Sequence, residues 1–259
     1  MFVSCQISDG LGNRLFQIAA LLGYAEKHGH TPIFIREWIK DNPAQPGGNK
    51  VCSLFPAIQT MSLGDVMGEW TVLKPQFEFA MSYMDLFFVG GHVKLDGYFQ
   101  SPKYFPSELP FLAGITAASL GENTLFLHVR RGDYLHPLNA HHCVDLTEYY
   151  QRALDVFPSD SLVYVCSDDI GWCKASLPGH YRSVASHRWR WVMGDEFETL
   201  SVMMGCTLGG ICANSTFSWW GGWLNKFAEK LVIMPATWSY SGPGRPIAKD
   251  LYPEGALRL

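Results

Sequence analysis

The sequence predicts an α/β protein with two parallel β-sheets, one in each half of its 259 residues. Short apolar runs of strand length recur along the chain, and stretches with helical spacing of apolar residues separate them. Glycines or polar side chains directly follow several of these runs. Because alternating strands and helices typically build a parallel sheet covered by helices, we expect one α/β lobe over residues 1–115 and a second over residues 116–259.

The first half begins with the pattern of a βαβ unit. Its expected elements are a strand at 2–7, a glycine turn at 9–13, a helix at 14–28 with Leu15, Ile18, Ala19 and Leu22 on its apolar stripe, and strands at 32–35 and 93–99. The Pro/Gly-rich stretch 40–50 predicts a loop, and most of 51–95 carries no clear periodicity.

The second half repeats the alternation of strands and helices more regularly. Strands are expected at 125–129, 162–166, 181–184, 210–213 and 231–235, and helices at 146–156, at 196–205 and after 214–218. Tryptophans 219, 220 and 223 in the last of these helices are expected to pack in the core.

The composition suits a globular protein that can bury a sizeable core. The chain is 47% hydrophobic and carries a formal net charge of −4, which argues against general nucleic-acid binding. No apolar run is long enough to span a membrane, and residues 1–7 lack the features of a signal peptide. We therefore expect a cytoplasmic protein and leave peripheral membrane association open.

The cysteines indicate free thiols rather than disulfides or a metal site. There are seven, an odd number, no Cys-x-x-Cys occurs, and several lie in apolar runs. His141, His142 and Cys143 form the one cluster with zinc-ligand chemistry, and a solvated loop is the favoured interpretation of it. We expect no bound metal and no cofactor.

Two adjacent arginines form the most informative feature of the chain. Arg130 and Arg131 follow the apolar run 124–129 and precede Gly132 and Asp133. Ligands of open α/β sheets bind at the carboxyl ends of strands, and an arginine there can bind two phosphate oxygens at once. A diphosphate site is one interpretation, and a turn held by an internal ion pair is the other.

Further polar residues follow other strands and would reach the same ligand. Gly12 and Asn13 open a helix, but Leu15 stands where a dinucleotide-binding fingerprint needs its third glycine, which argues against a nicotinamide or flavin site. Helix capping and tight turns are the alternatives for the other candidates, which are Ser167, Asp168, Asp169, Asn214, Ser215, Thr216 and Ser218.

These segments together resemble the α-1,2-fucosyltransferase family. The match runs from residue 5 to about residue 235 in the family's order, and its motifs are Gly10-Leu-Gly-Asn-Arg-Leu-Phe-Gln17, Asp96-Gly-Tyr-Phe-Gln-Ser-Pro-Lys-Tyr-Phe105, His128-Val-Arg-Arg-Gly-Asp-Tyr134, Ser167-Asp-Asp169 with Trp172-Cys-Lys174, and Ala213-Asn-Ser-Thr-Phe-Ser-Trp-Trp-Gly221. The segment 206–212 departs from the family, because it lacks the usual histidine and asparagine.

The resemblance implies a GT-B-like fold of two Rossmann-type lobes with the active site in the cleft between them. It implies metal-independent transfer of fucose, with inversion, from GDP-fucose to the 2-hydroxyl of a terminal β-galactoside. Arg130 would contact the diphosphate, Ser215 and Thr216 would lie near the phosphates, and Asp168 would lie by the nucleoside. His128 would approach the ribose or guanine, and either Glu196 or Glu198 would match the guanine-binding acid.

The residues leave the general base and two other functions open. Asp133 is a candidate base, although pairing with Arg130 or Arg131 is the favoured role, and Asn13 is expected to act in catalysis. The acceptor is expected on the first lobe, within 40–105, where Tyr98, Phe99 and Tyr104 could stack on a sugar. The alternatives are a protein O-fucosyltransferase and a sugar-binding module without activity.

Overall fold

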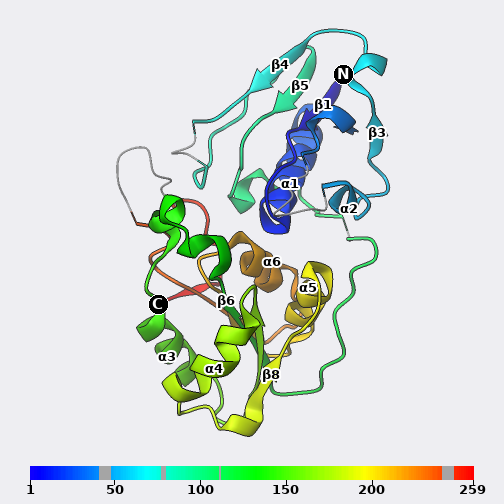
Figure 1. The fold of residues 1–259 in the computed structure, drawn as a ribbon. Coiled ribbons are helices and arrows are strands. Elements are labelled where there is room, and N and C mark those ends of the chain that lie inside the picture. The colour runs from blue at the N-terminus through cyan, green and yellow to red at the C-terminus, as the bar shows by residue number, and fades with distance from the viewer. Residues whose placement is uncertain (41–47, 77–79, 111, 241–247) are drawn as a thin grey trace. The chain divides into compact units, whose positions relative to one another are not determined.

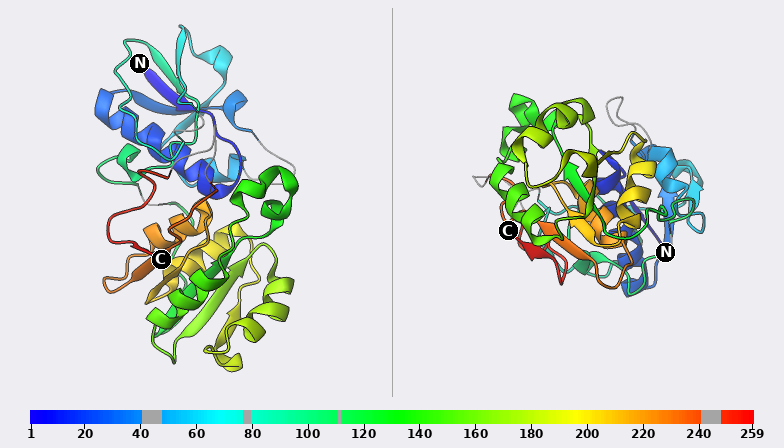
Figure 2. Two further views of the ribbon diagram at one scale, coloured as in Figure 1. Left: turned by 90° about the vertical axis from the view of Figure 1, so that its left-hand side faces the viewer. Right: turned by 90° about the horizontal axis from the view of Figure 1, so that it is seen from below.

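The computed structural model describes residues 1–40, 48–76, 80–110, 112–240 and 248–259, so residues 41–47 of the predicted loop lie outside the described residues. The chain divides into two compact units, shown in Figures 1 and 2. The first comprises Met1–Gly114 with Gly242–Pro253, and the second comprises Ile115–Ser241 with Glu254–Leu259. Both are α/β units, as the sequence predicts.

The first unit contains a five-stranded sheet in the order β3-β2-β1-β5-β4, and the pairings of these strands are parallel. Its strands are β1 (Phe2–Cys5), β2 (Thr31–Ile35), β3 (Gln59–Met61), β4 (Trp70–Leu73) and β5 (His92–Leu95), and its helices are α1 (Leu11–His28) and the short α2 (Gly48–Cys52). Neither β3 nor β4 was predicted from the sequence, because most of their residues are exposed, which removes the apolar pattern of a buried strand.

Helix α1 begins three residues earlier than predicted. Its N-cap is Gly10, and Gly12 and Asn13 therefore lie in the first helical turn rather than in the loop before it. The turn between β1 and α1 is made by Asp9, whose φ of 68° is left-handed, so the sharp change of direction falls on an aspartate and not on the glycines. The expected apolar stripe is buried at Leu15, Ile18 and Ala19.

The second unit contains a six-stranded parallel sheet in the order β11-β10-β9-β6-β7-β8. Its strands are β6 (Thr124–Val129), β7 (Leu162–Ser167), β8 (Trp189–Trp191), β9 (Gly209–Ile211), β10 (Leu231–Met234) and β11 (Leu257–Arg258). Its helices are α3 (Thr147–Val156), α4 (Ile170–His180), α5 (Glu196–Gly205) and α6 (Thr216–Leu224). The described chain also forms short 3-10 helices, among them η5 (Gly132–Leu135) and η6 (Pro137–His142).

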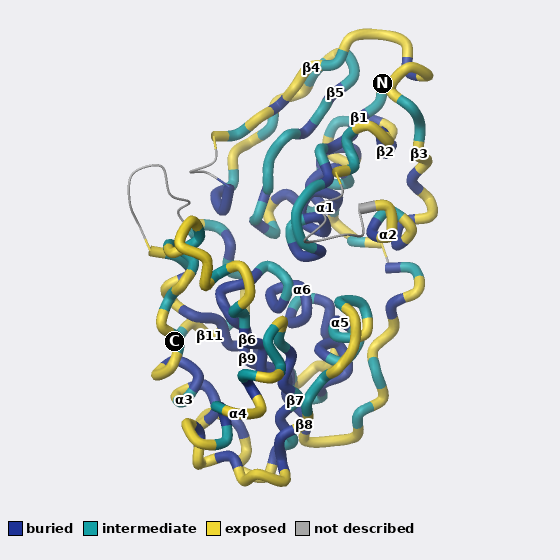
Figure 3. The backbone as a smooth tube through the Cα atoms, viewed as in Figure 1, coloured by how far each residue is buried: buried dark blue, intermediate teal, exposed yellow. Residues whose placement is uncertain are grey.

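Helices cover both faces of the second sheet. The α3 and α4 side chains Tyr150, Leu154 and Leu177 pack with Leu127 and Val165 of the central strands. Because crossovers between parallel strands are right-handed, α5 and α6, which follow strands on the return path, cover the opposite face (Figures 1 and 2). Figure 3 shows the central strands in the buried colour, and every residue of β6 is buried.

One predicted strand is wrong. Tyr181 and Val184 are buried in the core, but they belong to the turn that follows α4, and the strand of this region is β8. Their apolar side chains fill the space beneath the sheet from a turn, which mimics the alternation of a strand over so short a stretch.

Among the described helices, none is long and apolar enough to cross a membrane.

The segment before the C-terminus belongs to the first unit, although its position in the sequence placed it within residues 116–259. Asp250 Oδ2 accepts a hydrogen bond of 2.9 Å from the Tyr83 backbone N–H, and Asp250 Oδ1 forms an ion pair of 2.6 Å with Lys103. The Lys103 ammonium and the Tyr83 N–H lower the pKa of this carboxyl group. These contacts tie the segment to the unit of residues 1–114.

Candidate functional site

The strand order of the second sheet predicts where a ligand binds. The chain proceeds from β6 to β7 and β8 on one side of β6, and returns to β9 and β10 on the other side. The neighbours β6 and β9 therefore form the switch point of the sheet, outside whose carboxyl ends open α/β sheets bind ligands. Residues 130–134 follow β6 and residues 212–216 follow β9, so two of the predicted segments meet at this point.

Arg130 is held in place by two carboxylates. Its Nη2 lies 2.5 Å from Asp133 Oδ1, and its Nη1 lies 3.1 Å from Asp168 Oδ2. The guanidinium also lies over the Tyr134 ring, 5.4 Å from the ring centroid. The Arg130 side chain is 24% exposed, so its fork faces the edge of the sheet with a fixed orientation and partial access to solvent. The ion pair that the sequence favoured as the role of Asp133 is present.

Arg131 points to a different set of partners. Its Nε donates to Asp169 Oδ2 at 3.1 Å, and its guanidinium stacks 3.8 Å from the Trp172 ring centroid. Asp169 also caps α4, because its Oδ1 accepts from the Trp172 N–H at 3.0 Å. That N–H and the Arg131 guanidinium lower the pKa of Asp169. Of the three residues 167–169, for which the sequence left capping open, Asp169 is the one that caps α4. The Ser167 hydroxyl accepts from the Asp169 N–H.

Asp168 joins the two strand ends. Besides its pair with Arg130, its Oδ1 accepts from the Arg131 backbone N–H at 2.9 Å. Gly132 allows this approach, since a Cβ at position 132 would lie 2.4 Å from Asp168 Oδ2. The carboxylate thus occupies a site shaped by the glycine, and it fixes both the backbone and the side chain of the arginine turn.

Asn214 and the α6 N-terminus complete the site from β9. The Tyr134 hydroxyl donates to the Asn214 carbonyl at 2.9 Å, which links the turn after β6 to the turn after β9. The Asn214 amide donates to the carbonyls of His142 and Trp238, both at 2.8 Å. These contacts fix the backbone that leads into α6.

Ser215 caps α6, and its hydroxyl accepts from the Phe217 N–H at 3.3 Å. Thr216 is the first residue of the helix, so the backbone N–H groups of its first turn point toward the switch point, as an anion site requires. Ser218 is fully buried, and its hydroxyl donates to backbone carbonyls of Ala213 and Ser215. The position of Ser218 is that of a structural residue rather than of a ligand contact.

His128 is a buried, uncharged imidazole. Its side chain is 3% exposed and packs beside the Phe217 ring at a centroid distance of 5.6 Å. Burial, and then the nearby Arg130 guanidinium, lower the pKa of His128 to about 3. Its Nδ1 has no hydrogen-bond partner in the described part of the chain. The ring therefore offers a neutral polar group beside the arginine at any physiological pH.

The remaining predicted residues lie in the first unit. Gly12 is buried in the first turn of α1, and Asn13 Oδ1 accepts a hydrogen bond of 2.8 Å from Gln100 Nε2. The two residues follow β1, at the carboxyl edge of the first sheet.

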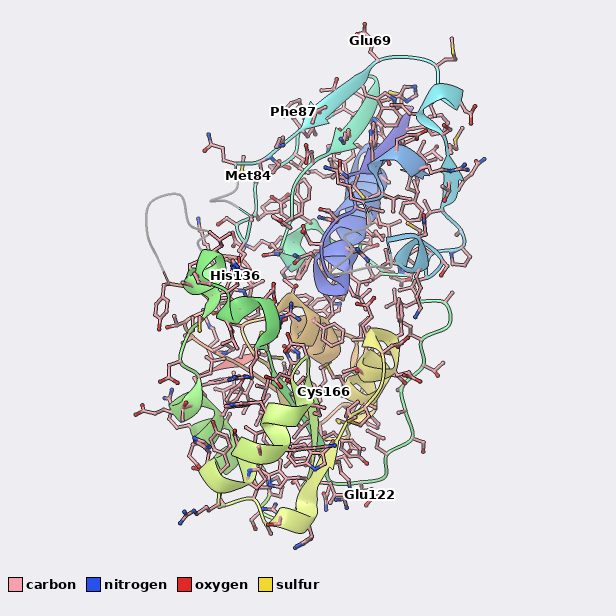
Figure 4. All side chains as sticks on the ribbon, in the orientation of Figure 1. Glu69, Met84, Phe87, Glu122, His136 and Cys166 are labelled. Carbon is pink, nitrogen blue, oxygen red and sulfur yellow. The ribbon has the colours of Figure 1, made fainter. Side chains whose placement is uncertain are left out.

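The sequence missed several residues that shape the arginine turn. Gly132 makes room for Asp168, and Tyr134 joins the turn after β6 to the turn after β9. Trp172 holds the Arg131 side chain. Tyr134 and Trp172 stand inside the recognised motifs, so their position within a motif was the available signal. The His141 and His142 rings contact each other at a tilt, and His142 stacks on Tyr134. Figure 4 labels His136 between η5 and η6 and Cys166 within β7, both in this unit.

Comparison with known proteins identifies the family of the chain. The model of glycosyl transferase family 11 matches residues 113–243, which is half of the chain and contains every strand end just described for the second unit. The chain belongs to glycosyl transferase family 11. This confirms the resemblance found from the sequence motifs.

Two relatives of this family 11 protein come from Escherichia coli. The O-antigen biosynthesis glycosyltransferase WbnK is 36% identical over 126 residues, which cover 45% of this chain and 39% of that protein. An α-1,2-colitosyltransferase is 24% identical over 273 residues, which cover 91% of this chain and 92% of that protein. The match to WbnK thus spans well under half of that relative's length. No solved structure matches the chain.

The candidates for a guanine-binding acid lie at the start of α5 in this family 11 protein. Asp195 and Glu198 form a capping box, in which Asp195 accepts from the Glu198 N–H and Glu198 Oε2 accepts from the Asp195 N–H at 2.8 Å. Glu198 is therefore engaged by the helix terminus. Of the two glutamates considered from the sequence, Glu196 is the one that the capping box leaves out.

Proposed function

We propose that this family 11 protein transfers L-fucose from GDP-fucose to the 2-hydroxyl of a terminal β-galactoside, with inversion at the sugar carbon. The observation that carries the proposal is the arginine turn after β6 beside the α6 N-terminus after β9, joined by the Tyr134–Asn214 hydrogen bond. This arrangement offers a fixed guanidinium and helix N–H groups at one switch point, which suits a diphosphate. The GT-B class of the fold stays a prediction.

The chemistry needs stabilisation of the leaving group. As the acceptor oxygen bonds to the anomeric carbon, the bond from that carbon to the diphosphate breaks and negative charge collects on GDP. Preorganised donors stabilise such charge best, because they need no rearrangement during the reaction. Arg130 and the N–H groups around Ser215 and Thr216 are our candidates.

The carboxylates around Arg130 set its orientation before the donor binds. Asp168 is anchored by the Arg131 N–H as well as by Arg130, whereas Asp133 is the more exposed partner, with 44% of its side chain accessible. We therefore propose that Asp168 keeps its contact with the Arg130 guanidinium when the donor binds. A phosphate oxygen of the donor would then replace Asp133 as the second partner of Arg130. Asp169 and Trp172 hold Arg131 in the same way.

The test is a transfer assay. The protein is incubated with GDP-fucose and a panel of galactosides, and free GDP and the mass gain of each acceptor are measured. Because the relative that covers most of the chain is named a colitosyltransferase, the panel includes the nucleotide sugar of colitose as a second donor. Release of GDP with a deoxyhexose mass added to a galactoside is the expected result. Donor binding without turnover across the panel would favour a binding module, and transfer only to folded protein domains would favour protein O-fucosylation.

Transfer is expected to need no metal ion. The chain has no Asp-x-Asp sequence, and the proposed counter-charge for the diphosphate is the arginine turn. We expect the protein to keep most of its activity after EDTA treatment and desalting, measured as GDP release. A strict magnesium requirement, restored by titration, would contradict this and would make Asp168 and Asp169 candidate ligands.

Asp133→Asn separates the two roles considered for this residue. Asp133 is paired with the Arg130 guanidinium, and this pair competes with phosphate for Arg130. We expect the variant to bind GDP as tightly as the wild type or up to about tenfold more tightly, and to keep kcat within about tenfold. Isothermal titration and steady-state kinetics measure both. Normal GDP affinity with a collapsed kcat would instead assign the base to Asp133.

A further inference from the structure

A pocket in the first unit occupies the position in its sheet that the arginine turn occupies in the other. It has a volume of about 380 Å³ and is lined by residues that follow β1, β4 and β5. The neighbours β1 and β5 are the switch point of the first sheet, because β2 and β3 extend the sheet beyond β1 and β4 extends it beyond β5. The pocket lies at the carboxyl edge, where open α/β sheets bind ligands.

The backbone is strained at both strand ends that form the pocket. Asp9, after β1, has a φ of 68°, and Phe99, after β5, has a φ of 49°. Left-handed conformations are unfavourable at residues other than glycine, and they gather at functional sites. Among the described residues, the third such residue is Asn123, which lies in the other unit. Two of the three therefore line this pocket.

The charges around the pocket balance. Lys40 and Lys74 are the basic lining residues, and Asp9 and Asp96 are the acidic ones. Lys74 pairs with Asp96 at 3.0 Å, which neutralises both. A strongly charged ligand would leave one sign unpaired in the pocket, so the lining favours an uncharged ligand.

The polar groups of the pocket suit a ligand that is rich in hydroxyls. The Asp9 carboxylate accepts a hydrogen bond of 3.1 Å from the Ser8 hydroxyl, and it can accept several further hydrogen bonds. The Ser8 backbone N–H donates to Gln17 Oε1 at 2.9 Å, which fixes the turn that presents Asp9. Gln6 is held in turn, because its amide donates to the Trp38 carbonyl and its oxygen accepts from Lys94.

Aromatic side chains form the apolar side of the same pocket. Phe99 packs edge-on against Tyr104 with ring centroids 5.3 Å apart, and Gly97 lets the Phe99 ring approach its backbone. Tyr98 lies next to Phe99 and beside Asp9, and burial and the Asp9 charge raise the pKa of its hydroxyl, which stays protonated as a donor. A pocket with an apolar wall and a few fixed polar groups is typical of small-molecule sites.

We infer that this pocket binds the acceptor as an uncharged pyranoside, whose hydroxyls bind Asp9 and whose apolar face packs on the half-buried Tyr98 ring, which the buried Phe99 supports from behind. The naming of this sugar as the acceptor rests on the proposed function. Asp9 is then the residue on which acceptor affinity depends most, because a carboxylate forms stronger hydrogen bonds to hydroxyls than a neutral group does.

The test uses lactose as the probe and measures its Kd by saturation-transfer NMR. Asp9→Asn keeps the shape of the side chain and tolerates the left-handed backbone, so it removes mainly the charge. We expect the Kd for lactose to rise about 10- to 100-fold, since a hydrogen bond to a charged group contributes about 1.5–3 kcal/mol. The matched control is Glu69→Gln. Glu69 is exposed, precedes β4 at the amino edge of the same sheet, and is labelled in Figure 4.

Kinetics separate this inference from the proposed function. In the transfer assay, Asp9→Asn should raise KM for the acceptor and leave KM for GDP-fucose unchanged, whereas Arg130→Ala should leave lactose binding unchanged. Lactose that binds Asp9→Asn as well as the wild type, or that does not bind the wild type, overturns the inference even if transfer is observed. If lactose binds through Asp9 but no donor is turned over, the proposed function fails and the sugar site stands.

Discussion

Arg130→Ala should lower kcat/KM for transfer by about 100- to 1,000-fold. Loss of one preorganised donor to a developing negative charge raises a barrier by about 2.7–4 kcal/mol, and Arg130 is the donor that the site holds most firmly. Its guanidinium is fixed by Asp133 and Asp168 on two sides and by the Tyr134 ring. The fold should survive, because the side chain lies at the edge of the sheet and not in its core.

Arg130→Lys tests the geometry of the guanidinium apart from its charge. Lysine keeps the positive charge, but its single ammonium cannot bond Asp168 and two phosphate oxygens in one plane. We expect a loss of at least about 100-fold, close to that of alanine. Arg152→Lys is the matched control, since Arg152 is exposed on α3. Lysine at 130 with near-normal turnover and an unchanged melting temperature would refute a bidentate role.

Most strands of the second unit could be predicted from the sequence because the central strands are buried on both faces. Every residue of β6 is buried, and such runs of apolar residues are visible without any knowledge of the fold. The strands β3 and β4 are short and mostly exposed, so the same method found nothing there. The apolar pattern of a sequence reveals strands that are buried. The strands β3 and β4 lie at the two edges of their sheet and bury few residues, so they leave no such pattern.

The contacts within the site depend on register, which the sequence does not display. Val129 lies opposite Ser167 in the β6–β7 pair, and this places Arg130 and Arg131 beside Asp168 and Asp169. A shift of one residue would exchange the faces of the side chains and break the contacts of Arg130 and Arg131 with these two carboxylates. The motifs therefore predicted which segments meet, while the strand pairing decided which carboxylate binds which arginine. The sequence also does not display which residue of the turn after β1 is left-handed. Glycine is the residue that usually takes this conformation, but here Asp9 takes it and the following glycines do not.

Gly132→Ala should impair transfer through a residue that contacts no ligand in our proposal. A methyl group at position 132 would lie 2.4 Å from Asp168 Oδ2, the oxygen that pairs with Arg130 Nη1. The carboxylate must move, and it then loses Arg130, the Arg131 N–H or both. With about 1.5–3 kcal/mol for a hydrogen bond to a charged group, we expect kcat/KM to fall about 10- to 100-fold. Calorimetric melting should show a much smaller change, because the site lies at the edge of the sheet.

Two further variants decide whether the Asp168 clash is the cause. Gly179→Ala in α4 is the matched control, because nothing lies within 4 Å of its added Cβ, and it should leave transfer unchanged. Asp168→Ala removes the group that the new methyl displaces, so the double variant Gly132→Ala/Asp168→Ala should be no worse than Asp168→Ala alone. Effects of residues that act through one contact are not additive, and such a cycle measures that coupling. Additive losses in kcat/KM would show that Gly132 acts by another route, and the assignment of Asp168 as the group that positions Arg130 would lose its main support.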